Sequence, residues 1–214
     1  MSNMSFSRPS GGNGSACQAA VQQIVAERAG REWCLFLDRD GVINRQVVGD
    51  YVRSRQHFEW LPGAALAVKK LREWAPHIVV VTNQQGIGKG LMSADDVALI
   101  HQHLQDGLAP DRLAIEAFQV CPHLESANCR CRKPMPGLVL DWLGEHPASE
   151  PYLSIMVGDS LGDLQLARNV AAVVGGCASI HIGEARLRGT ADASFGSLWD
   201  FAAAVGQARG EQGR

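Results

Sequence analysis

Three short apolar runs in the sequence each end on a side chain that can handle a phosphoryl group. The residues that follow the runs are Asp38, Thr82 and Asp159. Short runs rich in valine and isoleucine are typical of buried strands in a parallel sheet. Ligands bind beyond the carboxyl ends of such strands, so we expect the three side chains to meet in one crevice. There they could serve as a nucleophile, a phosphate anchor and a ligand for Mg²⁺.

The first run leads into two carboxylates. Asp38 and Asp40 are separated by one residue and are followed by Gly41. Alternate side chains of an extended chain point to the same side, so both carboxylates can face the crevice, and glycine permits the turn that follows. One carboxylate could attack phosphorus and form an aspartyl phosphate, while the other moves protons to the leaving group and from water. Taken alone, the same residues could also form a polar turn.

Other polar residues supply charge and hydrogen bonds for a phosphate. Thr82 and Asn83 end the second run and could hold phosphate oxygens. Lys133 could neutralise the phosphate and the attacking carboxylate, and the planar guanidinium of Arg132 could grip another group of the substrate. Asp163 could orient a cation or water, or could stabilise the start of a helix, and the sequence leaves both roles open.

A separate cluster of metal-type ligands lies within eleven residues of the chain. Its members are Cys121, His123, Cys129 and Cys131. Three thiols and one imidazole form a complete tetrahedral set for Zn²⁺, and a site with no open position should be structural. The alternatives are scattered thiols or a disulfide. Both are less favoured, because clustered cysteines in an intracellular chain point to metal binding. The loop leads directly into the two basic residues named above, so a bound metal would fix their position.

Strand and helix patterns alternate along the chain, which predicts an α/β fold with a doubly wound, mostly parallel sheet. We expect strands at residues 33–38, 77–82, 115–121 and 153–159, and one or two short strands within 171–182. We expect helices at residues 16–29, after Pro62, after Ser93, from Pro136, after Ser160 and near Ser197. Residues 83–90 are predicted to form a glycine-rich loop.

Composition narrows the class of partner. The chain has 214 residues and a net charge of −2 at pH 7, with basic residues clustered only within 130–133. A near-neutral balance argues against nucleic acid as a partner. No apolar run is long enough for a membrane span, and the first 15 residues lack the apolar region of a signal peptide. We therefore expect a cytoplasmic protein that binds no membrane. We further expect a monomer, and a small phosphorylated metabolite as its substrate.

In order and position, these motifs resemble those of the haloacid dehalogenase superfamily of phosphatases and phosphotransferases, over residues 33–182. The resemblance implies a Mg²⁺-dependent phosphomonoesterase that works through an aspartyl phosphate. The residue roles that it implies are nucleophile for Asp38, acid–base for Asp40, phosphate binding for Thr82 and charge stabilisation for Lys133. It implies that Mg²⁺ is held by Asp38, by the backbone carbonyl of Asp40 and by Asp159.

The resemblance also implies a Rossmann-like core, and we place the phosphatase domain at residues 31–205. Independently of the resemblance, we expect residues 1–30 to be a flexible N-terminal tail that could include a helix, and residues 206–214 to be a frayed C-terminal tail. One departure from the superfamily pattern is Val42, where many members have threonine. Only 41 residues separate Asp40 from Thr82, which leaves no room for a large cap domain. We expect an open site, roofed by loops such as the zinc loop.

The zinc loop narrows the resemblance to the subgroup of heptose 1,7-bisphosphate phosphatases and histidinol-phosphate phosphatases. The stretch from Gly86 to Gly90 favours a D-glycero-D-manno-heptose 1,7-bisphosphate 7-phosphatase. The short spacing between His123 and Cys129 favours the histidinol-phosphate alternative, whose cationic amine would need an acid such as Asp50 or Glu125. A polynucleotide 3′-phosphatase and a non-catalytic binding module are less favoured, the latter because every catalytic position is filled.

Overall fold

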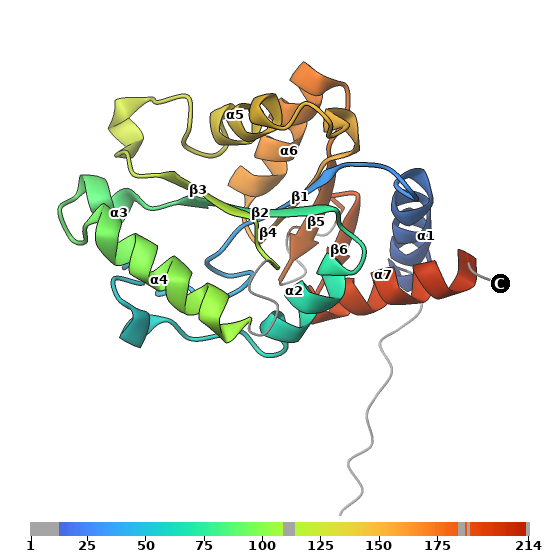
Figure 1. Cartoon of the computed structure of the whole chain (residues 1–214), viewed down its shortest axis with the longest axis horizontal. Coiled ribbons are helices and arrows are strands. Elements are labelled where there is room, and N and C mark those ends of the chain that lie inside the picture. Colours follow the sequence, from blue (N-terminus) through green and yellow to red (C-terminus); the bar gives the residue numbers. More distant parts are fainter. Residues whose placement is uncertain (1–12, 109–113, 184–186, 188, 213–214) are drawn as a thin grey trace, which may run out of the picture.

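The computed structural model of the chain describes residues 13–108, 114–183, 187 and 189–212. A sheet of six strands runs through its centre in the order β3-β2-β1-β4-β5-β6 (Figure 1). The strands are β1 (Cys34–Leu37), β2 (His77–Asn83), β3 (Ala117–Cys121), β4 (Ile155–Gly158), β5 (Ala178–Ile182) and β6 (Ala193–Phe195). Every neighbouring pair is parallel, which confirms the predicted fold class.

Helices cover both faces of this sheet (Figure 1). They are α1 (Asn13–Glu27), α2 (Ala64–Arg72), α3 (Gln85–Gly88), α4 (Ala94–Gly107), α5 (Gly137–Glu145), α6 (Leu161–Val174) and α7 (Leu198–Gln212), with 3₁₀ turns η1 (Arg55–His57), η2 (Glu125–Ala127) and η3 (Pro151–Leu153). Side chains of β1 alternate between the faces: Leu35 and Leu37 join the core with α1, α2, α4 and α7, whereas Cys34 and Phe36 join that of α5 and α6. Burial on both faces explains why the strands are continuous apolar runs.

The strand order places a topological switch point between β1 and β4. The chain adds β2 and β3 on one side of β1, and then returns to add β4, β5 and β6 on the other side. Asp38 directly follows β1, and Asp159 directly follows β4. Ligands of doubly wound sheets bind at this point, beyond the carboxyl ends of the strands, so the fold itself brings these two carboxylates to one crevice.

Two of the predicted helices begin with capping boxes. Ser93 and Asp96 form a capping box at the start of α4, and Ser160 and Asp163 form one at the start of α6. In each box the serine hydroxyl accepts from the aspartate N–H and the aspartate carboxylate accepts from the serine N–H. The second box fixes the junction at which Asp159 lies.

Three local features differ from the sequence-based expectation. The glycine-rich segment 83–90 is not wholly a loop, because it contains the one-turn helix α3, in which Lys89 N–H bonds to Gln85 O at 3.0 Å. Residues 171–174 belong to α6 rather than to a strand, and the helix ends only at Gly175, whose positive φ of 91° forms the C-cap. The short edge strand β6 was not anticipated.

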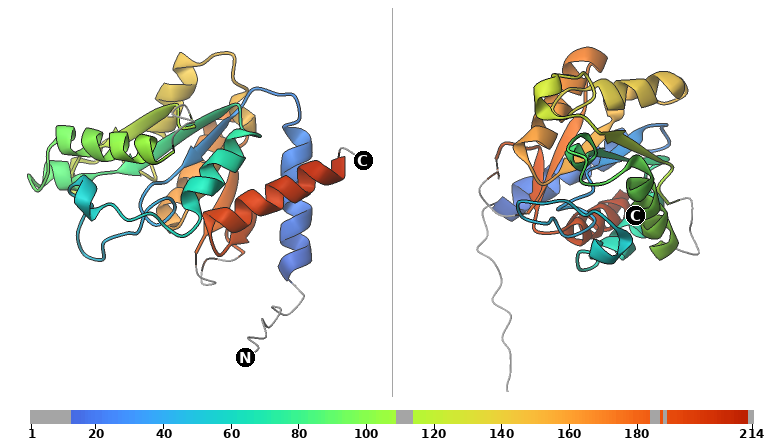
Figure 2. Two further views of the ribbon diagram at one scale, coloured as in Figure 1. Left: turned by 60° about the horizontal axis from the view of Figure 1, so that its bottom comes forward. Right: turned by 90° about the vertical axis from the view of Figure 1, so that its left-hand side faces the viewer.

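The two terminal helices pack against each other, and Figure 2 shows α7 crossing α1. The predicted N-terminal helix is confirmed, and Val21, Ile24 and Val25 of α1 are buried in the core. Of the predicted N-terminal tail, residues 1–30, the first twelve residues lie outside the described residues. The expectation of a frayed tail from residue 206 is wrong for 206–212, because α7 continues to Gln212 and buries Ala208.

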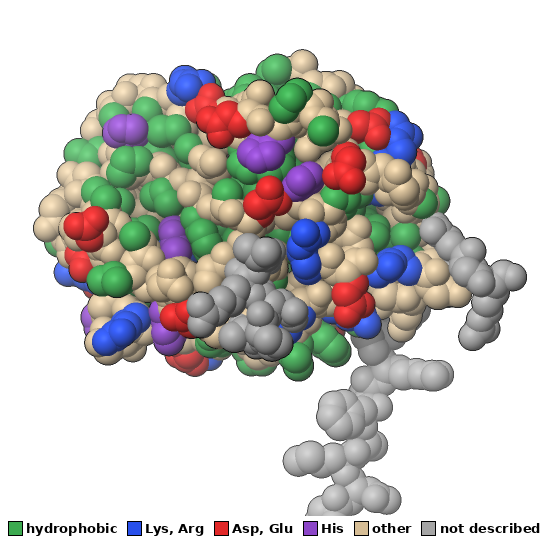
Figure 3. Space-filling model, viewed as in Figure 1, with side chains coloured by type: hydrophobic (Ala, Val, Ile, Leu, Met, Phe, Trp, Pro, Cys, Tyr) green, Lys and Arg blue, Asp and Glu red, His purple; other side chains and the backbone are tan. Residues whose placement is uncertain are grey.

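The surface gives no sign of a single-charge face in the view of Figure 3, where acidic and basic side chains are interspersed. Within the described part of the chain, no helix combines the length and the apolar character that a membrane crossing requires.

Candidate active site

A pocket of roughly 200 Å³ opens at the carboxyl ends of β1, β2 and β4. Its lining residues are Asp38, Asp40, Gln46, Val47, Asp50, Tyr51, Val52, Thr82, Asn83, Lys133, Asp159, Ser160 and Gly162. Six of the seven predicted catalytic, phosphate-binding and magnesium residues are therefore brought together, as the switch point requires. The seventh, Arg132, is not among the lining residues.

Lys133 joins two carboxylates beside the pocket. Its Nζ lies 2.7 Å from Asp38 Oδ1 and 2.7 Å from Asp163 Oδ1. Burial raises the pKa of Asp38 to about 8, together with the charges of Asp163 and Asp159, although Lys133 opposes the shift. Burial would lower the pKa of Lys133, but its two carboxylate partners outweigh it and raise the pKa. The ammonium therefore stays charged next to the predicted nucleophile.

Asp163 performs both of the roles that the sequence left open. Its Oδ2 accepts hydrogen bonds from the N–H and hydroxyl of Ser160 at 3.1 and 2.6 Å, which caps α6. Its Oδ1 pairs with Lys133, and the side chain is completely buried. A Cβ at Gly158 would lie 2.1 Å from Asp163 Cβ, so only glycine fits at that position of β4. Asp163 thus links the start of α6 to Lys133.

Asp40 is held by three side chains. Arg39 Nη2 donates to both of its oxygens at 3.1 and 2.9 Å, Asn44 Nδ2 donates at 2.8 Å, and Gln84 Nε2 donates at 2.9 Å. Burial works against ionisation of Asp40, but Arg39, Asn44 and Gln84 outweigh it and lower the pKa. Arg39 is itself fully buried, and its Nη1 lies 3.2 Å from Nε2 of His101 on α4. The acid–base candidate therefore has a fixed orientation.

Gln84 also sets the direction of the Thr82 hydroxyl. Its Nε2 donates to Thr82 Oγ1 at 2.8 Å as well as to Asp40. Because the threonine oxygen accepts this bond, its own hydrogen is free to donate into the pocket that Thr82 lines. This is the donor geometry that a phosphate oxygen requires.

Asn83 lines the pocket, but both polar atoms of its side chain contact the main chain of Lys133. Lys133 N–H donates to Asn83 Oδ1 at 3.0 Å, and Asn83 Nδ2 donates to Lys133 O at 3.2 Å. The geometry favours a positioning role for Asn83, instead of the direct phosphate contact predicted from the sequence.

Asp159 lies against the turn that follows the first motif. Gly41 has φ 88°, and a Cβ there would lie 2.0 Å from Asp159 Oδ2, so glycine is required by both the turn and the close approach. Burial, with the charge of Asp163, raises the pKa of Asp159 to about 6. Among the described residues, no cationic side chain forms an ion pair with Asp159.

The carboxylates can hold a divalent cation. Asp38, Asp159 and Asp163 each offer an oxygen, and these atoms lie within 4.8 Å of one another. Hard cations such as Mg²⁺ bind carboxylate oxygens, and an added positive charge would relieve the raised pKa values of Asp38 and Asp159. Since Asp163 is already occupied by Lys133 and Ser160, Asp38 and Asp159 are the more available ligands.

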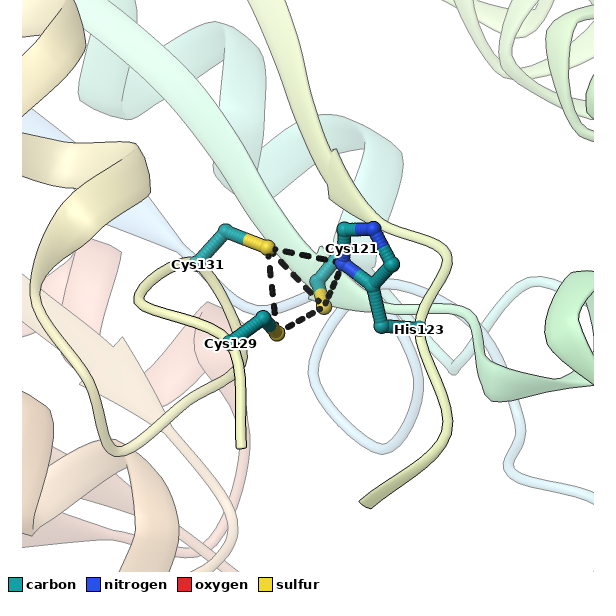
Figure 4. Close-up of side chains that lie close together, drawn as sticks. All are labelled: Cys121, His123, Cys129 and Cys131. Carbon is teal, nitrogen blue, oxygen red and sulfur yellow. Dashed lines mark hydrogen bonds between the residues drawn. The ribbon is translucent and has the colours of Figure 1, made fainter. Parts of the chain in front are cut away.

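The four predicted zinc ligands converge at the end of β3 (Figure 4). The three Sγ–Sγ distances among Cys121, Cys129 and Cys131 are 3.6, 3.4 and 3.3 Å, and His123 Nδ1 lies 3.1 Å from Cys131 Sγ and 3.7 Å from Cys121 Sγ. Tetrahedral Zn²⁺ with ordinary bond lengths would set edges of about 3.5–3.8 Å. The donor set therefore fits one tetrahedral metal with no position left open.

The segment that lines the wall of the pocket differs from the expected one. The sequence predicts that the zinc loop roofs the site, but no residue of the segment 121–131 lines the pocket. The wall comes instead from the connection after β1, which contributes Gln46, Val47, Asp50, Tyr51 and Val52. No cap domain lies within this connection, which agrees with the short spacing in the sequence.

Sequence reasoning missed four residues that support the site: Arg39, Asn44, Gln84 and His101. Arg39 and Asn44 stand within the motif of Asp40 and Gln84 stands in that of Thr82, so their place in these motifs was a usable signal. His101 comes from the middle of α4, where a histidine between apolar positions gives no indication that it reaches Arg39.

No family model matches the chain. A curated relative, D-glycero-alpha-D-manno-heptose-1,7-bisphosphate 7-phosphatase from Mycobacterium tuberculosis, is 72% identical over 190 residues, which cover 89% of this chain and all of the relative. The chain belongs to the heptose 1,7-bisphosphate 7-phosphatase family. It is a phosphatase of the haloacid dehalogenase superfamily.

More distant members of the family agree. D-glycero-beta-D-manno-heptose-1,7-bisphosphate 7-phosphatase from Rhodopseudomonas palustris is 35% identical over 147 residues, covering 65% of this chain and 80% of the relative. The crystal structure of D,D-heptose 1,7-bisphosphate phosphatase from B. bronchiseptica, complexed with magnesium and phosphate, superposes with a TM-score of 0.71 at 30% identity. That match covers 82% of this chain and 98% of the other.

Proposed function

We propose that this phosphatase removes the C7 phosphate of D-glycero-α-D-manno-heptose 1,7-bisphosphate. The observation that carries the proposal is the pocket at the switch point, in which Asp38 contacts Lys133 and Asp40 is clamped two residues further on. The α-anomer is supported by the relative that is 72% identical along its whole length, whereas relatives named for the β-anomer are 35–39% identical.

The site residues divide the reaction between them. A carboxylate oxygen of Asp38 attacks phosphorus, and the bond between phosphorus and the C7 oxygen breaks. Asp40 gives a proton to the C7 oxygen, and because its neighbours lower its pKa it must bind that proton before this step. Asp40 then takes a proton from water, which attacks the aspartyl phosphate, releases inorganic phosphate and restores Asp38. Lys133 and the Thr82 hydroxyl stabilise the charge on the transferred group, which is the main demand of phosphoryl transfer.

Two metals complete the proposal. Asp38, Asp159 and the backbone carbonyl of Asp40 would hold Mg²⁺, which supplies positive charge next to the phosphate when bound. Cys121, His123, Cys129 and Cys131 would hold a structural Zn²⁺.

The charged residues of the pocket wall help to distinguish between the two candidate substrates. A cationic amine, as in histidinol phosphate, needs an unpaired acid. Asp50 lines the pocket, but Arg53 Nε and Nη2 donate to its Oδ1 at 2.9 and 2.6 Å, and Glu125 does not line the pocket. Arg132 does not line the pocket either, so it gives no support for a second phosphate. The pairing of Asp50 with Arg53 weighs against a cationic amine, and in that way favours a bisphosphate.

The organisation of the molecule belongs to the same proposal. We place the phosphatase domain at residues 31–205, preceded by α1. We also propose that a monomer is active in the cytoplasm on this small metabolite, without nucleic acid or membrane partners.

The decisive experiment compares kcat/KM for the α- and β-anomers of heptose 1,7-bisphosphate and for histidinol phosphate, with Mg²⁺ present. We expect the α-bisphosphate to be the best substrate. A preference for histidinol phosphate of about tenfold, equivalent to about 1.4 kcal/mol in the transition state, would replace the heptose assignment by the alternative.

A further inference from the structure

The short helix α3 lies between the pocket wall and the zinc loop. On one side, Gly86 packs so closely on Tyr51 that a Cβ would lie 3.1 Å from Tyr51 Cγ and 2.8 Å from Met92 Cε. On the other side, Gly88 packs on Pro122, where a Cβ would lie 2.8 Å from the carbonyl oxygen. Both glycines are therefore required for close contact, and α3 touches both neighbours without a gap.

Polar contacts follow the same path. Gln85 Oε1 accepts from the backbone N–H of Glu125 in the zinc loop at 2.9 Å, while Gln85 Nε2 donates to the Tyr51 hydroxyl at 3.4 Å. Gly88 N–H donates to Pro122 O at 3.0 Å. Lys89 Nζ lies 5.3 Å from the centre of the Tyr51 ring, close enough for a cation–π contact. One side chain, Gln85, thus contacts the zinc loop and the pocket wall at once.

Tyr51 is placed to contact the part of the substrate beyond the transferred phosphate. The pocket residues from the strand ends and Lys133 handle the phosphate, whereas the segment 46–52 supplies the remaining wall. Tyr51 is the one aromatic side chain among the described lining residues. An aromatic ring offers a sugar chain a large, rigid surface and a hydroxyl for hydrogen bonding.

We propose that Tyr51 determines selectivity for the substrate beyond its transferred phosphate, and that Gln85 is a positioning residue that fixes Tyr51 against the zinc loop. The inference rests on the proposed function and deepens it. It gives the cysteine loop, which lines no part of the pocket, an indirect connection to the substrate through Gln85 and Tyr51.

The test uses two substrates of different size. Acetyl phosphate presents a phosphoryl group with almost nothing beyond it, whereas heptose 1,7-bisphosphate extends to the wall. For Tyr51→Ala we expect kcat/KM for the bisphosphate to fall at least about tenfold, mainly through KM, with acetyl phosphate hydrolysis within about twofold of the parent. Equal losses for both substrates, or no loss for either, would overturn the role of Tyr51.

A double-mutant cycle tests the positioning role. Tyr51→Phe and Gln85→Leu each remove the same hydrogen bond. The double variant should therefore raise KM for the bisphosphate by less than the product of the two single increases. Gly86→Ala should raise the same KM by displacing the ring. Gly144→Ala is its matched control, because a Cβ at Gly144 meets nothing within 4 Å. Independent effects in the cycle, or a Gly86→Ala enzyme that behaves like Gly144→Ala, would overturn the coupling.

The parent enzyme separates this inference from the proposed function. If the parent hydrolyses histidinol phosphate instead of the bisphosphate, the substrate assignment fails. The same variants are then compared with histidinol phosphate and acetyl phosphate, and the same outcomes decide the roles of Tyr51 and Gln85. Thermal unfolding of each variant confirms that a changed KM does not come from a misfolded chain.

Discussion

The side-chain amide of Asn83 is hydrogen-bonded to both the N–H and the carbonyl of Lys133, at 3.0 and 3.2 Å. This clamp holds the backbone of a residue whose Nζ lies 2.7 Å from Asp38. Since small displacements of a catalytic group are costly, we expect Asn83→Ala to lower kcat by about 10- to 100-fold. Asn83→Asp, which keeps the acceptor for the Lys133 N–H, should retain more activity. Steady-state kinetics with Mg²⁺ measure both.

The competing role for Asn83 is a direct contact with phosphate. In that case Asn83→Ala would weaken competitive inhibition by inorganic phosphate while kcat stayed near the parent value. That pair of results would contradict the positioning role.

Asp38 is predicted to carry the phosphoryl group. Asp38→Asn keeps the shape of the side chain but removes the nucleophile, so we expect kcat to fall by at least about 10³-fold, or ~4 kcal/mol of barrier. Mass spectrometry of the acid-quenched parent should find a phosphorylated peptide that contains Asp38 and is absent from the variant. Near-normal turnover by Asp38→Asn would refute the assignment.

The sequence predicts which residues form the pocket because these residues stand at the ends of strands. Asp38, Thr82 and Asp159 each follow an apolar run, and the parallel order of the strands brings them together. The four predicted zinc ligands could be found equally well, since they are close in sequence. Both signals are local, and the fold only had to bring local motifs together.

Contacts between distant segments could not be predicted in this way. His101 contacts Arg39 only because of the way in which α4 packs on the sheet. Residues 46–52 line the pocket because of the path of an irregular connection, which the sequence does not reveal. Helix α3 was not predicted, because glycine is a poor helix former. Its glycines are present because Gly86 packs closely on Tyr51 and Gly88 on Pro122.

His101 should make the fold sensitive to acid. Burial, with the charge of Arg39, lowers its pKa from 6.5 to about 3, although the charge of Asp40 opposes the shift. Between pH 6.5 and about 3 the unfolded chain therefore binds a proton that the native state excludes, and stability falls as the pH falls. We expect His101→Gln to lose less unfolding free energy than the parent between pH 7 and pH 4.5, as measured by urea unfolding. Parallel losses in the two proteins would show that His101 does not contribute.

The cysteine cluster should bind close to one zinc ion per chain. Cys129→Ser removes one of four ligands, so elemental analysis should find less zinc, and the melting temperature should fall. Five of the six strands contain none of the four ligands, so the loss of stability should be partial. Cys17→Ser is the control, because Cys17 lies far from the cluster and donates to Ser194 O, a bond that serine can replace. Parent protein purified without chelators and free of zinc would contradict the site.

Gly41 should be more sensitive to substitution than its backbone conformation alone explains. Gly30→Ala is a matched control, because Gly30 also has a positive φ, 68° against 88°, but a Cβ there meets nothing within 4 Å. Both variants should lose about 1–2 kcal/mol of stability from the left-handed backbone. Only Gly41→Ala should also displace the Asp159 carboxylate, since its Cβ would lie 2.0 Å from Oδ2. We therefore expect Gly41→Ala to raise the Mg²⁺ concentration needed for half-maximal activity at least about tenfold, with Gly30→Ala unchanged. Similar magnesium dependence in the two variants would show that Asp159 is not held by this contact.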